Sequence, residues 1–267
     1  MANAGLTYEG IKLGEQYGPY KYPMKDRIGP LLEAISNAHP WQHGRSPWGP
    51  SVAPPSILGT ICLAFIDSIA AIPAGTAHVA QTVLTQAALR LDRQPIAYGA
   101  FTEKFERDGQ NLAIFEARVR DETGLLVGHA RSTLAFSVAA SKHDAPTERK
   151  GHLESITRTV SAGQMSAFSQ DVPNAGGAML AADYISEMMT GVLGKDWFEN
   201  AEMSLQFPGS IQAGDTLTAN GKLHSETLEG AVLHRVFEVW AENQNGEAVA
   251  VGTAGSLVIP PIATLGA

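Results

Sequence analysis

Cysteine is almost absent from this sequence, and the one that occurs, Cys62, lies inside an apolar segment. One cysteine can form neither an intramolecular disulfide nor a cysteine-based metal site, which is typical of a reducing cytoplasm. Basic residues are also scarce, because 19 Lys and Arg stand against 27 Asp and Glu and the net charge is −8. Nucleic-acid binding needs a basic face, so this charge argues against a nucleic-acid partner.

The sequence has no long hydrophobic run either. The longest, from about residue 57 to 73, contains Asp67 and Ser68, and it is too short and too polar to span a membrane. The first 14 residues lack a basic segment followed by an apolar one, so we expect no signal peptide. We therefore expect a cytoplasmic protein without a membrane partner.

The few basic residues are unevenly spread. Residues 1–151 hold 15 Lys and Arg and 14 Asp and Glu, whereas residues 152–267 hold 4 and 13. An anionic part of a ligand should therefore prefer the first half, where Arg90, Arg93 and Arg107 could contact it. The same distribution also fits ordinary solvated surfaces.

The chain contains an internal repeat, which indicates two copies of one structural unit. A single offset of 122 residues, without a gap, aligns the C-terminal parts of the two halves. The matched pairs are Gly99 with Gly221, Phe115 with Phe237, Glu116 with Glu238, Gly124 with Gly246, and Val127 with Val249.

The repeated segment is rich in predicted strands. Apolar and polar residues alternate over 115–120 and 237–242, the period of a strand with one buried face. Gly124 and Asn245-Gly246 then mark hairpin turns, because Gly and Asn tolerate positive φ. The long strands predicted next are 125–136 and 248–259, so each half should end in an antiparallel meander.

An apolar helix is predicted before each meander, over 56–72 and over 178–193. Both helices carry few charges on any face, so a sheet should wrap around each of them. Residues 141–152 are polar and lack periodicity, which is typical of a linker. We therefore divide the chain into an N-terminal unit (1–140), a linker (141–152) and a C-terminal unit (153–267).

Motifs in both halves resemble those of a known family. In the first half they are Asn37-Ala38-His39-Pro40-Trp41, Ser46-Pro47-Trp48-Gly49-Pro50 and Gly75-Thr76-Ala77-His78-Val79, and in the second Tyr184-Ile185-Ser186-Glu187-Met188-Met189 and Ala213-Gly214-Asp215-Thr216-Leu217. With these motifs the chain resembles two-domain MaoC-like hydratases and dehydratases from Tyr8 to Val258. The resemblance implies an α+β double hot-dog fold, with two antiparallel sheets each wrapped around a central helix.

The resemblance also implies a reaction, the hydration of a trans-enoyl thioester or its reverse, without a cofactor. This chemistry needs a base that activates water for attack at Cβ and an acid that protonates Cα. It also needs a hydrogen-bond donor that stabilises the thioester oxyanion. The family supplies the first two as Asp and His in a loop of the form Asp-x-Asn-Pro-x-His. It supplies the third as a backbone N–H near the start of the central helix, where the helix dipole favours negative charge.

Neither half contains that loop intact. In the first half, alignment of the motif places Asn37 at the Asp position and Gln42 at the His position, and an amide cannot act as a base. In the second half Asp171 falls near the expected Asp, but no Asn-Pro-x-His follows it. The usual acid and base pair is therefore incomplete.

The repeat shows independently that the second loop is short. In the first half, 19 residues separate Ser36 from Ser56, whereas in the second half 8 residues separate the counterparts Ser169 and Ala178. The second half thus lacks about 11 loop residues, so we expect an open pocket that admits a bulkier or branched substrate. We expect this pocket as a tunnel between the halves, lined by residues 37–51 and 169–178.

Five residues are candidates for catalysis or for oxyanion binding. Asp171 is the candidate base, although it also fits a turn aspartate at a helix entry. Gly176 and Gly177 are candidate oxyanion donors, or glycines that permit close packing. His39 or His43 is the candidate acid reaching across from the first half, or else stabilises an irregular loop.

Further candidates concern substrate binding. Trp41, Trp48 and Tyr184 fit either a pocket wall or the core. Asp183 is a lone carboxylate on a buried helix, and such groups are usually paired or lie at a cavity. His78 begins a predicted strand and is either functional or structural. We expect no metal site.

Three functions remain open at this stage. The first is a hydro-lyase, a hydratase or dehydratase with a modified active-site loop that acts on an acyl thioester or related carbonyl compound. The second is an atypical hot-dog enzyme that performs isomerisation, cyclisation or elimination on a specialised carbon skeleton. The third is a non-catalytic acyl-binding subunit. In each case we expect a homo-oligomer and a small-molecule partner, free or bound to CoA or to a carrier protein.

Overall fold

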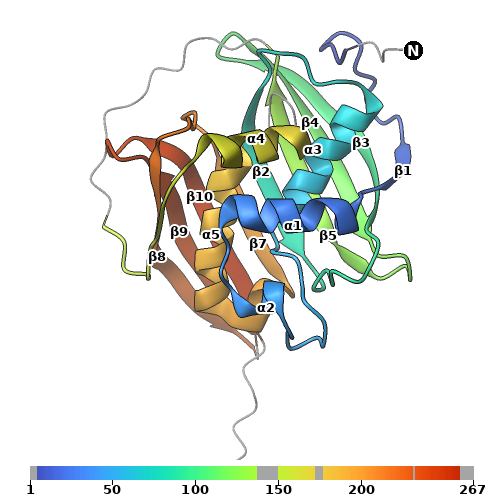
Figure 1. Cartoon of the computed structure of the whole chain (residues 1–267). Helices are drawn as coiled ribbons and strands as arrows, with labels where there is room; N and C mark the ends of the chain where they lie inside the picture. The colour runs from blue at the N-terminus through green and yellow to red at the C-terminus, as the bar shows by residue number, and fades with distance from the viewer. Residues whose placement is uncertain (1–4, 137–149, 172–176, 231, 259–267) are drawn as a thin grey trace, which may run out of the picture.

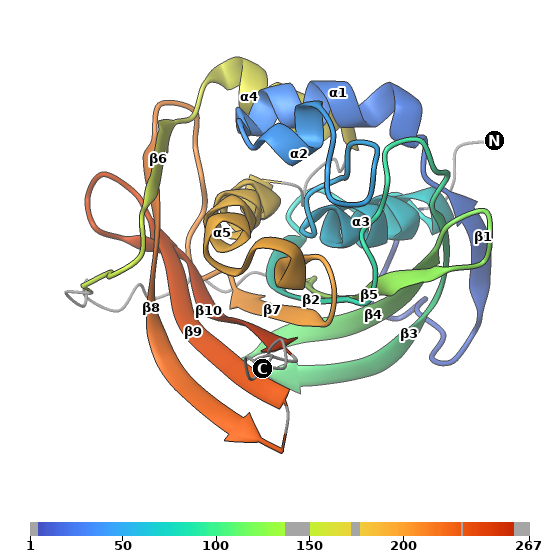
Figure 2. The ribbon, with the colours of Figure 1, turned by 90° about the horizontal axis from the view of Figure 1, so that it is seen from below.

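One antiparallel sheet curves around two central helices (Figure 1, Figure 2). The computed structural model describes residues 5–136, 150–171, 177–230 and 232–258. Within these residues the strands are β1 (Tyr17–Lys21), β2 (Ala77–Thr85), β3 (Ile96–Arg107), β4 (Gln110–Arg120), β5 (Leu126–Ala135), β6 (Ile156–Thr159), β7 (Ala201–Gln206), β8 (Thr216–Glu229), β9 (Val232–Glu242) and β10 (Ala248–Val258). The helices are α1 (Met24–Ile35), α2 (Pro40–His43), α3 (Ile57–Ile69), α4 (Ala162–Asp171) and α5 (Gly177–Leu193), with a 3-10 helix η1 (Gly194–Trp197).

The predicted repeat is confirmed by the register of the strands. Ile96 pairs with Arg120 in the β3–β4 hairpin, and Thr218 pairs with Glu242, each 122 positions later, in the β8–β9 hairpin. Even the irregularities coincide, because the register shifts between residues 101 and 103 and again between residues 223 and 225. The turn glycines 124 and 246 both have positive φ, of 90° and 77°.

The strand order is β1-β3-β4-β5-β2-β7-β10-β9-β8-β6, so the second half repeats the order of the first in reverse. This arrangement confirms the α+β double hot-dog class. The two meanders do not remain separate sheets, because β2 and β7 pair along residues 80–85 and 201–206. An unpaired sheet edge leaves backbone groups without partners, and this pairing removes one edge from each half.

The central helices α3 and α5 are the two helices predicted from the sequence. Most of each is buried, since the sheet encloses them and leaves little surface for solvent (Figure 2). They approach each other where α3 has a glycine: a Cβ atom at Gly59 would lie 2.8 Å from Cε of Met179. The absence of a side chain at this position therefore permits the close packing.

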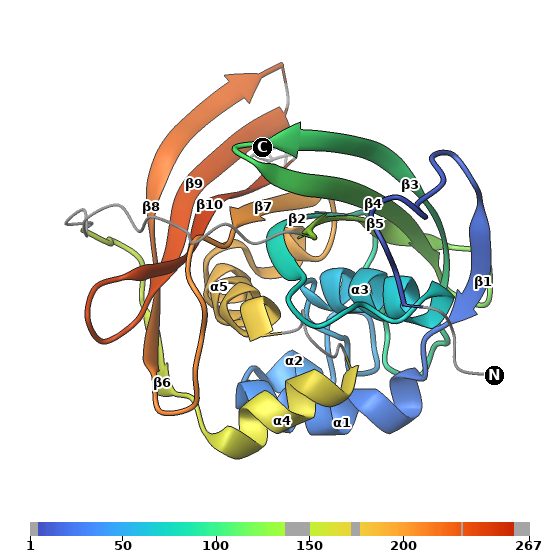
Figure 3. The same cartoon turned by 90° about the horizontal axis from the view of Figure 1, so that it is seen from above.

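A third layer, which the sequence did not predict, covers the central helices on the side away from the sheet. It consists of α1, α2 and α4, with α1 and α4 side by side (Figure 2, Figure 3). The Gln164 side-chain amide donates a hydrogen bond to the Ser36 hydroxyl across this pair, at 3.1 Å. Residues 141–149 of the predicted linker lie outside the described residues. No helix in the described ranges has the length and apolarity that a membrane span requires.

Candidate active site

A cleft of about 870 Å³ opens at the start of α5. Its wall comes from both halves of the chain, because it includes the beginning of β2, the tip of the β3–β4 hairpin and the segment that follows β7. The lining residues used below are Thr76, His78, Gln81, Phe105, Arg107, Arg131, Gly177, Ala178 and Phe207. The size suits a small organic ligand.

The amino-terminal end of α5 provides backbone donors at this cleft. Gly177 is the first residue of the 17-residue helix, and both Gly177 and Ala178 line the cleft. The first N–H groups of a helix have no partner inside the helix, and the helix dipole adds partial positive charge. An oxyanion or a polarised carbonyl is therefore the kind of group that this end of the cleft stabilises.

His78 lies at the same cleft with a buried imidazole. Its ring lies against that of Phe207 in a tilted arrangement, with the ring centroids 4.9 Å apart, and the residue is 6% exposed. Neither ring nitrogen has a hydrogen-bond partner among the described residues. Burial lowers the pKa of His78 to about 4, so the ring is neutral near pH 7.

Two arginines, Arg107 and Arg131, line the cleft. Arg131 forms ion pairs with Glu103 and with Glu116, and Arg107 lies 3.8 Å from the carboxylate of Asp108 in an exposed position. Of the three arginines considered for a phosphate-bearing ligand, Arg107 alone is among the cleft-lining residues.

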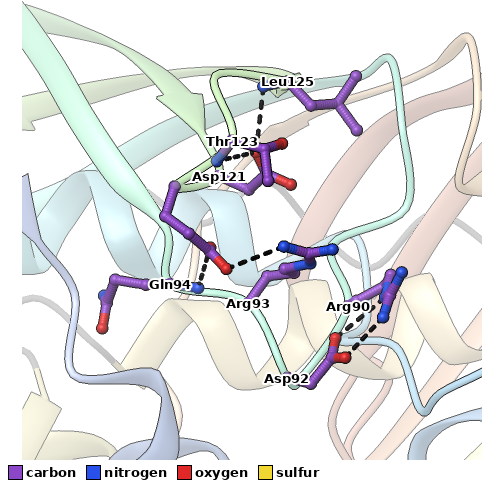
Figure 4. Close-up of polar contacts among 8 residues, drawn as sticks. Arg90, Asp92, Arg93, Gln94, Asp121, Thr123 and Leu125 are labelled. Atoms are coloured by element: carbon purple, nitrogen blue, oxygen red, sulfur yellow. Dashed lines mark hydrogen bonds and ion pairs between the residues drawn. The ribbon is translucent and has the colours of Figure 1, made fainter.

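The other two arginines belong to a different surface. Arg90 forms a two-point ion pair with Asp92, at 3.0 and 2.6 Å, and Arg93 contacts Glu122 at 3.2 Å (Figure 4). Glu122 also accepts a hydrogen bond from the backbone N–H of Gln94. These contacts hold the loop after residue 89 against the turn between β4 and β5.

In the other half, the repeat counterpart of the cleft is a smaller cleft of about 560 Å³, whose lining includes Asn200, His234 and Thr253, the counterparts of His78, Leu112 and Arg131. The start of α3 is not part of its lining. The 122-residue repeat relates Gly177 to Pro55 and Phe207 to Thr85. At that place the Thr85 hydroxyl donates to the backbone carbonyl of Trp197, at 3.2 Å, and about 10 Å³ remains beside the Phe198 side chain. Of the two equivalent helix starts, that of α5 lines an open cleft, whereas that of α3 borders only this small space among the described residues.

The loop of residues 37–51 lies near the small space at the start of α3. The Trp41 and Trp48 rings pack against Phe198, with centroid distances of 5.7 and 5.0 Å. The Trp48 indole also donates to the carboxylate of Glu199, at 2.5 Å. None of the residues 37–51 is among those that line the described cleft at α5, which differs from the expected tunnel.

Both candidate histidines of this loop make local contacts. His39 caps α2, because its Nδ1 accepts a hydrogen bond from the backbone N–H of Trp41 at 3.3 Å. Nε2 of His43 lies 2.6 Å from the backbone carbonyl oxygen of Asn37. Both contacts stabilise the loop, and the structure does not bring either ring to Gly177.

A second group of buried polar side chains comes from α5 and from the 37–43 segment. Asp183 is fully buried, and neither of its carboxylate oxygens makes a hydrogen bond of normal geometry within the described residues. Burial raises the pKa of Asp183 to about 7, although the nearby Ser56 hydroxyl opposes this effect. Asn37 and Gln42, which stand where the family motif has its Asp and His, are 4% and 2% exposed and retain unpaired amide atoms.

Tyr184 lies next to this group and belongs to the core. It is buried beneath the guanidinium of Arg158, which is 5.2 Å from the ring centroid. Arg158 in turn makes a two-point ion pair with Glu187, at 2.6 and 2.8 Å, and donates to the backbone carbonyl of Ile35. This network connects α1, β6 and α5.

The structure describes the remaining candidates only in part. Asp171 is the last residue of α4, and its side chain lies outside what is described. Gly176 falls within residues 172–176, which are also outside the described ranges. Among the described residues, no three His, Cys, Asp or Glu side chains lie close enough together to hold a metal ion.

His78 is the residue at this site whose position the sequence left undecided. A single histidine at the beginning of a strand gives no local signal that its ring faces a cleft. The only available signal was its place in the Gly75–Val79 motif, because part of the cleft wall comes from the second half, through Gly177, Ala178 and Phe207.

Comparisons with known proteins agree with this fold. No protein-family model matches the sequence, and no curated protein matches it either. A solved MaoC-like dehydratase superposes with a TM-score of 0.70 at 13% identity, covering 94% of this chain and 99% of that chain. A MaoC-like dehydratase from Phytophthora capsici superposes with a TM-score of 0.64 at 12% identity, covering 92% and 96%.

A third similar structure is a Mycobacterium tuberculosis protein described as having a double hotdog fold. It superposes with a TM-score of 0.61 at 12% identity and covers 95% of this chain and 98% of that chain. At such identities the likeness shows the fold alone. The chain is a double hot-dog protein, and its structure is similar to those of MaoC-like dehydratases.

Proposed function

We propose that this protein is a hydratase- or dehydratase-like lyase that acts on an acyl thioester, or a related carbonyl compound, in the cleft at α5. The observation that carries the proposal is the position of Gly177, where the start of a 17-residue helix lines a cleft of about 870 Å³. Unpaired N–H groups at a helix start can hold the oxygen of a carbonyl group as it gains negative charge.

In this proposal the base is Asp171, which ends α4 just before the segment that leads into α5. During hydration its carboxylate takes a proton from water while the water oxygen bonds to Cβ of the enoyl group. The N–H of Gly177, together with that of Gly176, holds the resulting enolate oxygen. Protonated Asp171 then returns this proton to Cα, which completes the addition of H and OH across the double bond and restores the carboxylate.

The proposal assigns no proton transfer to His39 or His43, because both rings bond within their own loop. It also assigns Trp41, Trp48 and Tyr184 to packing, since these rings contact Phe198 and Arg158. Arg107 is the basic side chain placed to meet a phosphate-bearing carrier such as CoA.

The test is incubation with crotonyl-CoA and with longer and branched enoyl-CoA substrates, following the loss of absorbance of the conjugated thioester. Removal of a general base lowers the rate by about 10²–10⁴. We therefore expect Asp171→Asn to lower kcat by that factor while the melting temperature stays unchanged.

A matched control is Asp26→Asn, because Asp26 is exposed in the first turn of α1 and lies outside the cleft lining. This variant should retain wild-type activity. Full activity of Asp171→Asn would overturn the assignment of the base. Tight thioester binding without turnover in the wild type would indicate a non-catalytic acyl-binding protein instead.

A further inference from the structure

We propose that His78, contributed by the first half of the chain, is a catalytic hydrogen-bond donor to the substrate carbonyl in the cleft at α5. This inference rests on the proposed function and adds to it a residue from outside the shortened loop. The donor is an imidazole N–H, which keeps its proton throughout the reaction.

An irregularity in β2 places His78 at the cleft. Its register with β5 shifts between His78 and Ala80, which marks a bulge at Val79. Gln81 and Val83 are buried on the inner face of β2, so strict alternation would turn Val79 inward and His78 outward. The bulge reverses this order, and bulges are a common means of re-aiming a side chain beside a site.

A contact from the other half holds this arrangement. The backbone carbonyl of Val79 accepts a hydrogen bond from the backbone N–H of Phe207 at 2.9 Å, while the Phe207 ring lies against His78. The Gln81 side chain is committed elsewhere, because it accepts from the Ser132 hydroxyl at 2.7 Å and donates to the Thr82 carbonyl at 2.9 Å. Gln81 therefore orders the wall beneath His78 without occupying its ring nitrogens.

The imidazole has unused hydrogen-bonding capacity. The Ala80 backbone and Gln81 lie near the ring, yet neither forms a hydrogen bond of normal geometry, and both ring nitrogens stay unpaired within the described residues. Buried polar groups in native proteins are almost always paired, so an unpaired one requires a reason. A carbonyl oxygen bound beside Gly177 would supply the missing acceptor.

The protonation state of the ring suits this role. Because burial lowers the pKa of His78 to about 4, the imidazole is neutral at pH 7 and carries a single N–H. A neutral imidazole can polarise a carbonyl or stabilise an enolate without giving up its proton. The charged groups that share this cleft, Arg107, Asp108 and Arg131, have exposed side chains.

The other half lacks this feature. The repeat places Asn200 at the position of His78, in the smaller counterpart cleft of about 560 Å³. Phe198 and Trp197 occupy the space at the start of α3, and that helix start is not part of the lining of the smaller cleft. A histidine therefore occurs in the cleft that a helix start lines, and an asparagine occurs in its counterpart. His78 and the start of α5 thus line one cleft that is built from both halves.

The probe for this inference is 4-dimethylaminocinnamoyl-CoA, whose absorbance maximum moves to longer wavelength when its thioester carbonyl is polarised. The wild type should bind it with a clear red shift. His78→Phe preserves the ring and removes the donor, so it should lose most of the shift. Removal of one such donor lowers kcat by about 10²–10³, and we expect this effect on crotonyl-CoA hydration, with little change in KM.

His78→Gln restores an N–H donor and should recover part of both the red shift and kcat. If His78→Phe fails to fold, His78→Gln still tests the role of the donor. His129→Phe is the matched control, because His129 lies on the neighbouring strand β5 and outside the cleft lining. An equal red shift in the wild type and His78→Phe would overturn the role of His78 and leave the proposed function standing. The absence of binding and turnover in the wild type would overturn both.

Discussion

The Thr82 hydroxyl lies 3.2 Å from the Ser204 hydroxyl, where β2 pairs with β7, and the two residues are 122 positions apart. This separation equals the offset of the sequence repeat. A residue that pairs with its own counterpart can lie only on the axis that relates the two halves. Thr82 and Ser204 thus mark a pseudo-two-fold axis, and the halves join as the subunits of a symmetric dimer do.

The burial of Asp183 predicts that its carboxyl group makes folding stability depend on pH. Its folded pKa of about 7 lies above the unfolded value of 3.8, so the folded state holds the proton more tightly. The stability that this proton contributes is complete below pH 3.8 and is lost as the pH rises toward 7. The loss should be on the order of 3 kcal/mol for so large a shift at a buried site.

His78 has the opposite effect between about pH 4 and 6.5, because its folded pKa is lowered. The quantity to compare is therefore the difference in the free energy of unfolding between Asp183→Asn and the wild type, measured by urea unfolding at several pH values. We expect Asp183→Asn to gain stability relative to the wild type from pH 4 to 7 and to gain little above pH 7. A difference that does not vary with pH would contradict the raised pKa of Asp183.

The ion pair of Arg158 and Glu187 should contribute far more than a surface pair. Its two side chains are 20% and 9% exposed, so Glu187→Gln leaves a largely buried guanidinium without its charged partner. We expect a loss of about 2–4 kcal/mol in the free energy of unfolding, measured with urea. The control is Glu238→Gln, because the Lys222–Glu238 pair is 39% and 41% exposed and should cost less than about 1 kcal/mol.

Gly99 and Gly221, which the repeat matches, should differ in their tolerance of an added methyl group. A Cβ at Gly99 would lie 2.4 Å from the backbone oxygen of Glu116 and 2.7 Å from the Phe115 ring, neither of which can move easily. A Cβ at Gly221 would meet mainly the flexible ends of Leu153 and Met188, at 2.8 and 3.2 Å.

Gly99→Ala should therefore lower the free energy of unfolding by about 2–3 kcal/mol, and Gly221→Ala by about 1 kcal/mol. Thermal unfolding of the two variants under identical conditions measures this difference. Equal melting temperatures would mean that the first meander adjusts as easily as the second.

The sequence by itself determined the repeat and the elements with a strong local signal. Alternation over 115–120 and 237–242 fixes the meander strands, and glycines 124 and 246 fix their turns, because both signals act between neighbouring residues. The helices α3 and α5 were equally evident from their apolar composition. By contrast, α1 contains Pro30 and has no side-chain cap, so its local sequence is a poor helix signal.

The tertiary structure alone decided how these elements form a site. The pairing of β2 with β7, the bulge that turns His78 inward and the filling of the α3 start by Phe198 all depend on contacts between distant residues. The burial of Asp183 beside Ser56 is of the same kind. Local propensity reflects only near neighbours along the chain, whereas a pKa or an open cleft is set by whatever the folded chain packs around a residue.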